Sequence, residues 1–182
     1  MKAVMISIRP EWCEKIAQGR KTIELRKNKP KLELPFKCYI YCTIGCPTSA
    51  QYEWCDYEPY GEVIGEFVCD AILSHCEMAN ADLAEQMSCV RRGKILEYSG
   101  GKEVFGWHIS KLKIYDTPKE LCEFYKPCIK KAYPWCLNCE RGLTEEERLM
   151  HIYNRIVDVP CDGWLKRPPQ SWYYVEELSY EP

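Results

Sequence analysis

The sequence predicts an α+β fold in which several strands, with short helices between them, build a closed or nearly closed β-sheet. Two observations support this class: short apolar runs recur along the chain, and Pro, Gly or Asn residues bound many of them. The chain has 182 residues, 46% of them hydrophobic, which is enough for one domain with a sizeable core. No internal repeat or low-complexity linker divides the sequence, so we expect a single domain over residues 1–182.

Six segments have the pattern of β-strands. They are residues 3–8, 21–26, 37–43, 62–73, 104–115 and 171–175. Residues 21–26 alternate between charged and apolar side chains, which predicts a half-buried strand with Glu24 and Arg26 on its exposed face. Gly65 interrupts the fourth segment and indicates a bulge or a bend.

Short helices are predicted to connect these strands. The helical segments are residues 11–18, 80–87, 88–98, 117–124 and 144–158. Gly19 ends the first helix, because glycine adopts the left-handed conformation at little cost. Thr117 and Pro118 predict the start of the fourth helix, and Thr144 with Glu147 forms a capping box at the start of the fifth.

Charge is distributed unevenly along the chain. The formal net charge is −2, which argues against strong non-specific binding to nucleic acid. Residues 15–37 nevertheless carry eight Lys or Arg residues against Glu24 and Glu33, whereas residues 38–90 contain no Lys or Arg. Such a chain can present one basic face while its net charge stays negative. The alternative is that these charged side chains simply lie on the solvated surface of a soluble protein.

The chain is rich in cysteine but shows no secretory signal, which points to a reducing compartment. The chain has 13 Cys, its first residues have no secretory signal, and no stretch approaches the length of a membrane span. We therefore expect a cytoplasmic protein without membrane association, in which most thiols are reduced. Cys38, Cys42 and Cys69 lie in strand-like runs and should act as small buried hydrophobic residues.

Residues 19–26 (GRKTIELR) fit the pattern G-x-K-x-x-E-x-R. The segments ISIRPEWCEKIAQ, KCYIYCT, EVIGEFVCDAI, FGWHI and PPQSW surround this motif in order. Together they resemble the ASCH domain family of the PUA-like superfamily, over residues 1–116 and 164–178. The resemblance implies a PUA-like β-barrel (pseudobarrel), with the motif lining a cleft that binds RNA or a nucleotide-like ligand. Residues 117–163 exceed the family core and read as a Cys-rich helical insertion.

The chemistry of the motif suits such a ligand. Lys21 and Arg26 can hold phosphate, and Glu24 can accept hydrogen bonds from a base amino group or a ribose hydroxyl. Arg9 would support this cleft, and Trp107 and Trp172 are candidate stacking surfaces for a base. The alternative interpretation of the three charged residues is a surface ladder of salt bridges.

A second function remains open at this point. A subset of the family consists of small amidohydrolases that act on N4-acetylcytidine, with a Thr nucleophile at the position of Glu24. Lys21 matches that pattern, but Thr22 would point to the opposite face of the strand. Glu24 could instead act as a general base, which keeps hydrolysis of acylated cytidine nucleosides as the alternative.

The insertion adds a third hypothesis. Cys136 and Cys139 have C-x-x-C spacing, which allows two thiolates to bind one structural zinc ion. Cys128, His151 or Cys161 would have to supply the other ligands, and the alternative is a set of buried free thiols. The insertion could also be the surface through which an interaction protein works. The sequence does not predict an oligomeric state.

Overall fold

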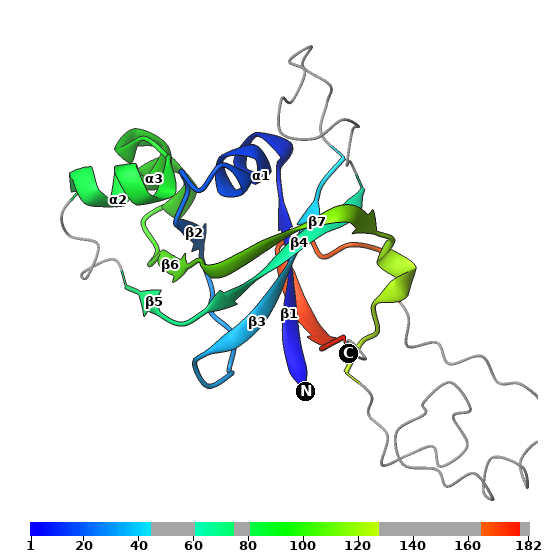
Figure 1. Cartoon of the computed structure of the whole chain (residues 1–182). Coiled ribbons are helices and arrows are strands. Elements are labelled where there is room, and N and C mark those ends of the chain that lie inside the picture. Colours follow the sequence, from blue (N-terminus) through cyan, green and yellow to red (C-terminus); the bar gives the residue numbers. More distant parts are fainter. Residues whose placement is uncertain (45–60, 75–80, 128–164, 179–182) are drawn as a thin grey trace, which may run out of the picture.

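Two β-sheets form the body of the protein (Figure 1). The computed structural model describes residues 1–44, 61–74, 81–127 and 165–178. The large sheet has the order β7-β4-β3-β1-β8, with β1 (Lys2–Ile8), β3 (Phe36–Cys42), β4 (Glu62–Cys69), β7 (Ser110–Lys119) and β8 (Trp172–Glu176). The small sheet has the order β2-β6-β5, with β2 (Ile23–Arg26), β5 (Ile72–Leu73) and β6 (Phe105–His108).

Three α-helices accompany the sheets in the described part of the chain. They are α1 (Pro10–Ala17), α2 (Ala81–Ser88) and α3 (Arg92–Ser99). Pro10 opens α1, and Gly19, just beyond its end, has a φ of 69°, which confirms the predicted helix end. Gly100 closes α3 in the same left-handed conformation. None of the helices described is long and apolar enough to cross a membrane.

The mixed α+β class is confirmed, but the described strands form two open sheets rather than one closed barrel. The chain passes from one sheet to the other within two segments that the sequence predicts as single strands. Residues 62–73 divide into β4 and β5, and residues 104–115 divide into β6 and β7. The two points at which the chain passes between the sheets lie side by side. The His108 amide at one of them donates a hydrogen bond to the Ala71 carbonyl at the other, at 2.9 Å.

A side-chain contact joins the two crossing points. Asp70 lies between β4 and β5, and its carboxylate is 2.6 Å from Nδ1 of His108, the last residue of β6. The hydrogen bond with His108 lowers the pKa of Asp70 from its usual value, with a further contribution from Ser110. Both side chains are more than one-third exposed, so this contact is a surface feature.

Gly65 is the bulge that the sequence indicates. The register of β4 against both of its neighbouring strands shifts next to this residue. A Cβ atom at Gly65 would lie 2.5 Å from the carbonyl oxygen of Lys113 on β7, so only glycine permits this close approach.

The small sheet is buried on both sides. Ile23 and Leu25 of β2 pack against Ala84 of α2 and Ile95 of α3, and Figure 1 shows both helices beside this sheet. Trp107 of β6 points the other way, into the core that the small sheet shares with β1, β3, β4 and α1. The face of β2 that carries Glu24 and Arg26 therefore lies toward the large sheet.

Two further expectations have different outcomes. Cys38, Cys42 and Cys69 are fully buried, which confirms their role in the core. The helix predicted over residues 117–124 is wrong, because β7 continues to Lys119 and is followed by a short 3-10 helix, η1 (Leu121–Glu123), that Glu120 caps. The helix predicted over residues 144–158 lies outside the described residues, as does most of the insertion 117–163.

Candidate ligand-binding site

Lys21, Glu24 and Arg26 converge in the structure. The Lys21 Nζ lies 3.2 Å from Oε2 of Glu24, and an Arg26 guanidinium nitrogen lies 3.0 Å from Oε1. Each carboxylate oxygen thus holds one cation, and the three side chains together carry one excess positive charge. We call these three residues the charged cluster.

The charged cluster is buried, which corrects the expectation of an exposed strand face. The relative exposures are 2% for Lys21, 7% for Glu24 and 8% for Arg26. The alternation of β2 is as predicted, but the large sheet and α1 cover its charged face and the helices α2 and α3 cover its apolar face. A single strand cannot show by its own sequence that both of its faces are covered.

Backbone carbonyl groups from other elements hold both cations. Lys21 Nζ donates to the carbonyl of Ser88 at 2.8 Å, at the C-terminal end of α2, where the helix dipole favours a cation. An Arg26 nitrogen donates to the carbonyl of Ser7 at 2.6 Å, near the end of β1. A second Arg26 nitrogen lies 3.5 Å from the Ser171 hydroxyl oxygen. The cluster therefore connects the small sheet, the large sheet and α2.

Two buried hydrogen-bond donors near the cluster have no partner among the described residues. They are Nε of Arg26 and Nε1 of Trp107. Glu24 and Trp107 are directly opposite each other in the pairing of β2 with β6, so these donors come from the same face of the small sheet. A buried donor without an acceptor is costly, and an acceptor atom from a ligand would satisfy such groups.

Trp107 and Trp172, the two predicted stacking residues, differ in how much of each ring is exposed. Trp107 has no exposed surface, and its ring packs against Phe36 at 5.8 Å and Trp172 at 5.7 Å between centroids. No base can stack on Trp107 in this conformation, which corrects the expectation for that residue. Trp172 is only partly buried and retains exposed surface.

Trp12 of α1 also borders this site, although the sequence motif does not include it. Its ring lies 5.3 Å from Nζ of Lys21 and 4.5 Å from Nζ of Lys15, and it is partly exposed. The spacing of Trp12 and Lys15 on one helix face could have indicated the second contact. The proximity of Lys21 depends on how α1 packs and has no sequence signal.

Arg9 is predicted to support the cleft, but the contacts that the structure gives it are with the start of α1. It is exposed and precedes α1, where its carbonyl accepts hydrogen bonds from the amides of Trp12 and Cys13. No ion pair within the described residues joins its side chain to the charged cluster. Its part in ligand binding stays a prediction.

A buried thiol borders the charged cluster. Cys13 of α1 is fully buried, and burial raises the pKa of its thiol well above the usual value, with Cys42 and Glu24 adding to the effect. Such a thiol stays protonated and unreactive, so Cys13 contributes packing rather than nucleophilic chemistry.

The predicted metal ligands cannot be placed in this structure. Cys136 and Cys139 lie outside the described residues. Within residues 1–44, 61–74, 81–127 and 165–178, no group of three or more His, Cys, Asp or Glu residues is arranged to hold a metal ion.

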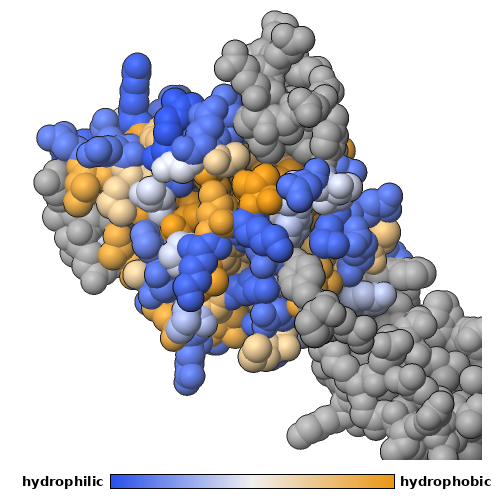
Figure 2. Space-filling view, in the orientation of Figure 1, coloured by the Kyte–Doolittle hydropathy of each residue, from blue (hydrophilic) through white to orange (hydrophobic). Residues whose placement is uncertain are grey.

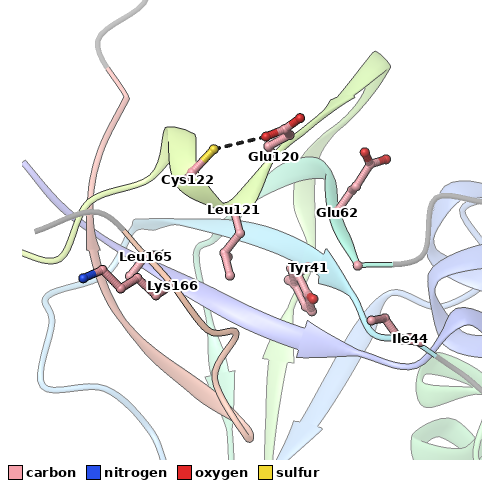
Figure 3. A pocket seen from close by; sticks show the side chains of 9 residues that line it. Tyr41, Ile44, Glu62, Glu120, Leu121, Cys122, Leu165 and Lys166 are labelled. Atoms are coloured by element: carbon pink, nitrogen blue, oxygen red, sulfur yellow. Dashed lines mark hydrogen bonds between the residues drawn. The ribbon is translucent and has the colours of Figure 1, made fainter.

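A separate open cavity of about 670 Å³ lies away from the charged cluster (Figure 3). Its lining residues are Tyr41, Ile44, Gly61, Glu62, Glu120, Leu121, Cys122, Leu165 and Lys166. Tyr41 belongs to the core on the opposite side of the large sheet from its neighbours Ile40 and Cys42, so the cavity and the cluster are on different faces. The Cys122 thiol donates to the Glu120 carboxylate within this cavity (Figure 3).

The described residues thus form a mixed α+β fold of two open sheets, with the charged cluster between the small sheet and the large one. A model of the ASCH domain matches residues 6–116 of the sequence, which is more than half of the chain. The chain therefore belongs to the ASCH domain family, whose PUA-like modules are generally associated with RNA binding. No curated protein matches the sequence closely enough to count as a relative.

Solved structures support the same fold. The chain resembles the ASCH protein of Zymomonas mobilis, with a TM-score of 0.55 at 17% identity over 96% of this chain and 88% of that one. A tyrosine-to-phenylalanine variant of that protein gives a TM-score of 0.57 at 17% identity, over 97% and 92% of the two chains. A serine-to-alanine variant also gives 0.57 at 17% identity, over 96% and 89%.

Proposed function

We propose that this protein binds RNA or a nucleotide-like ligand through the charged cluster of Lys21, Glu24 and Arg26. The observation that carries the proposal is the excess of buried positive charge beside two buried donors without partners among the described residues. Buried charges are normally paired, because removing them from water is costly. An anionic group with several acceptor oxygens, such as a phosphate, complements this arrangement.

Partly exposed aromatic rings suggest how a ligand reaches the cluster. Trp12 lies over Lys21 on the side of α1, and Trp172 lies beside Trp107 on the side of β8. Both rings are only partly buried, unlike Trp107. We propose that their side chains move to admit the ligand and that one of them then stacks on its base.

Binding is favoured over hydrolysis by the position of Glu24. Both of its oxygens already accept from cations, so accepting a proton from water would weaken both ion pairs. Thr22 is held through its backbone, which bonds to Met87 and Ile109, and it precedes β2 rather than taking the place of Glu24. We expect no product when the protein is incubated with acylated cytidine nucleosides and analysed by chromatography.

Charge-specific variants test the binding site. Arg26→Lys keeps the charge but loses the planar fork, so it should weaken binding of ribonucleoside monophosphates by roughly tenfold in calorimetry. Glu24→Gln removes a negative charge, so phosphate binding should be unchanged or tighter. Lys94→Gln, on the exposed surface of α3, is the matched control.

The folded state has to be checked in parallel, because breaking a buried ion pair costs about 3–5 kcal/mol. Thermal unfolding of each variant separates loss of binding from loss of structure. If Arg26→Lys stays folded and binds nucleotides as tightly as the unmodified protein, the charged cluster is not the binding site. If Glu24→Gln alone abolishes binding, Glu24 contacts a base amino group or a ribose hydroxyl instead.

A further inference from the structure

The segment that follows β2 places lysines among aromatic rings. The Lys27 Nζ lies 4.9 Å from the centroid of the Tyr98 ring, and the Lys29 Nζ lies 5.2 Å from that of Phe105. The backbone amide of Lys31 donates to the hydroxyl of Tyr174 at 2.7 Å. We call these six residues the lysine–aromatic strip.

The lysines of the strip have no acidic partners in the described part of the chain. Lys27, Lys29 and Lys31 are all exposed, and none takes part in an ion pair among the residues described. Lys37 and Lys94, in contrast, are each 3.0–3.3 Å from a carboxylate. Three neighbouring cations without carboxylate partners form a surface that attracts an anion.

The strip is continuous with the charged cluster. Lys27 follows Arg26 directly in the sequence, and Phe105 is opposite Arg26 in the pairing of β2 with β6. The Tyr174 ring contacts Trp172 at 5.5 Å, and Trp172 contacts Trp107 at 5.7 Å. In Figure 1 the segment between β2 and β3 leaves the small sheet and turns back at the start of β3.

We propose that the lysine–aromatic strip is a docking surface for single-stranded RNA that leads into the charged cluster. This inference rests on the proposed function and names the partner. A lysine that lies over an exposed ring can exchange its place with a base, which then stacks on the ring while the ammonium moves to a phosphate. A duplex keeps its bases stacked on one another and cannot use such rings.

The rings differ in how much surface they offer. Tyr98 is 40% exposed at the end of α3, so it can accept a base once the Lys27 ammonium moves off its ring. Phe105 and Tyr174 are partly buried and pack against the main core, which holds them in place. Rigid rings beside exposed lysines are the usual composition of a single-strand binding surface. Figure 2 shows one face of the molecule, on which hydrophobic surface lies between hydrophilic side chains.

Removal of two lysines tests the electrostatic part of the proposal. The double variant Lys27→Gln with Lys29→Gln should bind a fluorescent single-stranded RNA of about ten nucleotides roughly tenfold more weakly in anisotropy titrations. The slope of log affinity against log salt should become less steep by about 1.4. The control is Lys94→Gln with Lys102→Gln, which removes the same charge from exposed positions outside the strip.

A ring variant tests the stacking part. Tyr98→Leu keeps an apolar side chain but removes the aromatic face, and it should weaken binding of the same RNA by at least about fivefold. Binding of the corresponding duplex should be weaker than that of the single strand and unaffected by this variant. Equal affinity for duplex and single strand would overturn the choice of partner.

The outcomes separate this inference from the proposed function. Strip variants should leave binding of ribonucleoside monophosphates unchanged, since that binding depends on Arg26. If RNA affinity is the same in the strip variants as in the unmodified protein, or falls equally in the control, the strip is not the docking surface and the cluster proposal stands. If Arg26→Lys changes no binding while the strip variants weaken RNA binding, the cluster proposal fails and the strip stands.

Discussion

Glu24 lies between two cations from the same short stretch of chain, and this position allows three charged side chains to be buried together. Lys21 reaches one carboxylate oxygen and Arg26 reaches the other, at 3.2 and 3.0 Å. The carbonyl groups of Ser88 and Ser7 accept from the same two cations, whereas Nε of Arg26 has no partner among the described residues. Each charge thus has several partners, which is the condition for stable burial.

Replacement of Gly65 tests how closely β4 and β7 pack. Gly65→Ala places a methyl group against the backbone oxygen of Lys113, and the rigid strand β7 cannot yield as a flexible side chain would. We expect a loss of about 1–3 kcal/mol in the free energy of unfolding, measured by urea titration. Gly93→Ala is the control, because nothing lies within 4 Å of its Cβ position in α3. It should be neutral or stabilise by up to about 1 kcal/mol. A neutral Gly65→Ala would contradict the close approach of β4 and β7.

The elements depend on two crossing points where the chain changes sheets. β4 leads into β5 and β6 leads into β7, and the contact between Asp70 and His108 holds these two passages together. This contact and the backbone bond from His108 to Ala71 form a junction between the two passages. Because both side chains are more than one-third exposed, the side-chain contact adds little to stability.

Asp70→Asn tests this junction through its pH dependence. The hydrogen bond with His108 lowers the pKa of Asp70 in the folded protein, so the ionised form favours folding. This contribution is present above the unfolded pKa of about 4 and is lost as pH falls through the lower folded pKa. The variant should lose less than about 1 kcal/mol near pH 7, and its difference from the unmodified protein should shrink as the pH falls below about 4.

Urea unfolding at several pH values measures both effects. Asp116→Asn is a suitable control, because Asp116 is exposed on β7 and takes part in no ion pair within the described residues. A difference between Asp70→Asn and the unmodified protein that stays constant down to low pH would show that ionisation of Asp70 is not involved.

The elements also show what sequence patterns can and cannot predict. The strand positions and the bulge at Gly65 follow from local alternation and from glycine, so they were predictable. The division of residues 62–73 and 104–115 between two sheets depends on distant pairing partners, which leave no local signal. The spacing of Lys21, Glu24 and Arg26 is visible in the sequence, but the burial of Glu24 and the contact of Trp12 with Lys21 depend on packing.

For the whole molecule, the two faces of the large sheet carry separate cores. One core contains Val4, Ile40 and Trp107, and the other contains Met5, Tyr39 and Phe124. The first is rich in cysteine, with Cys13, Cys38, Cys42 and Cys69 all fully buried. These thiols have no access to solvent while the protein is folded.

Alkylation of the native protein should therefore be restricted to cysteines that are exposed in the fold. Burial raises the pKa of Cys69 to about 12, and it raises those of Cys13 and Cys38 as well, so few reactive thiolates form near pH 8. Iodoacetamide should label Cys89 and Cys122, which have exposed surface, and should spare the four core thiols. Peptide mass spectrometry before and after denaturation measures this difference. Rapid native labelling of Cys38 or Cys42 would contradict the described core.

The position of β1 in the large sheet has a consequence for synthesis of the chain. β1 pairs on one side with β3 and on the other with β8, where Lys2 is opposite Glu176. A ribosome adds about 5–20 residues per second, so roughly 10–35 s pass between the synthesis of β1 and that of β8. Throughout that interval the edge of β1 that later pairs with β8 is unpaired, and it can form hydrogen bonds with other nascent chains.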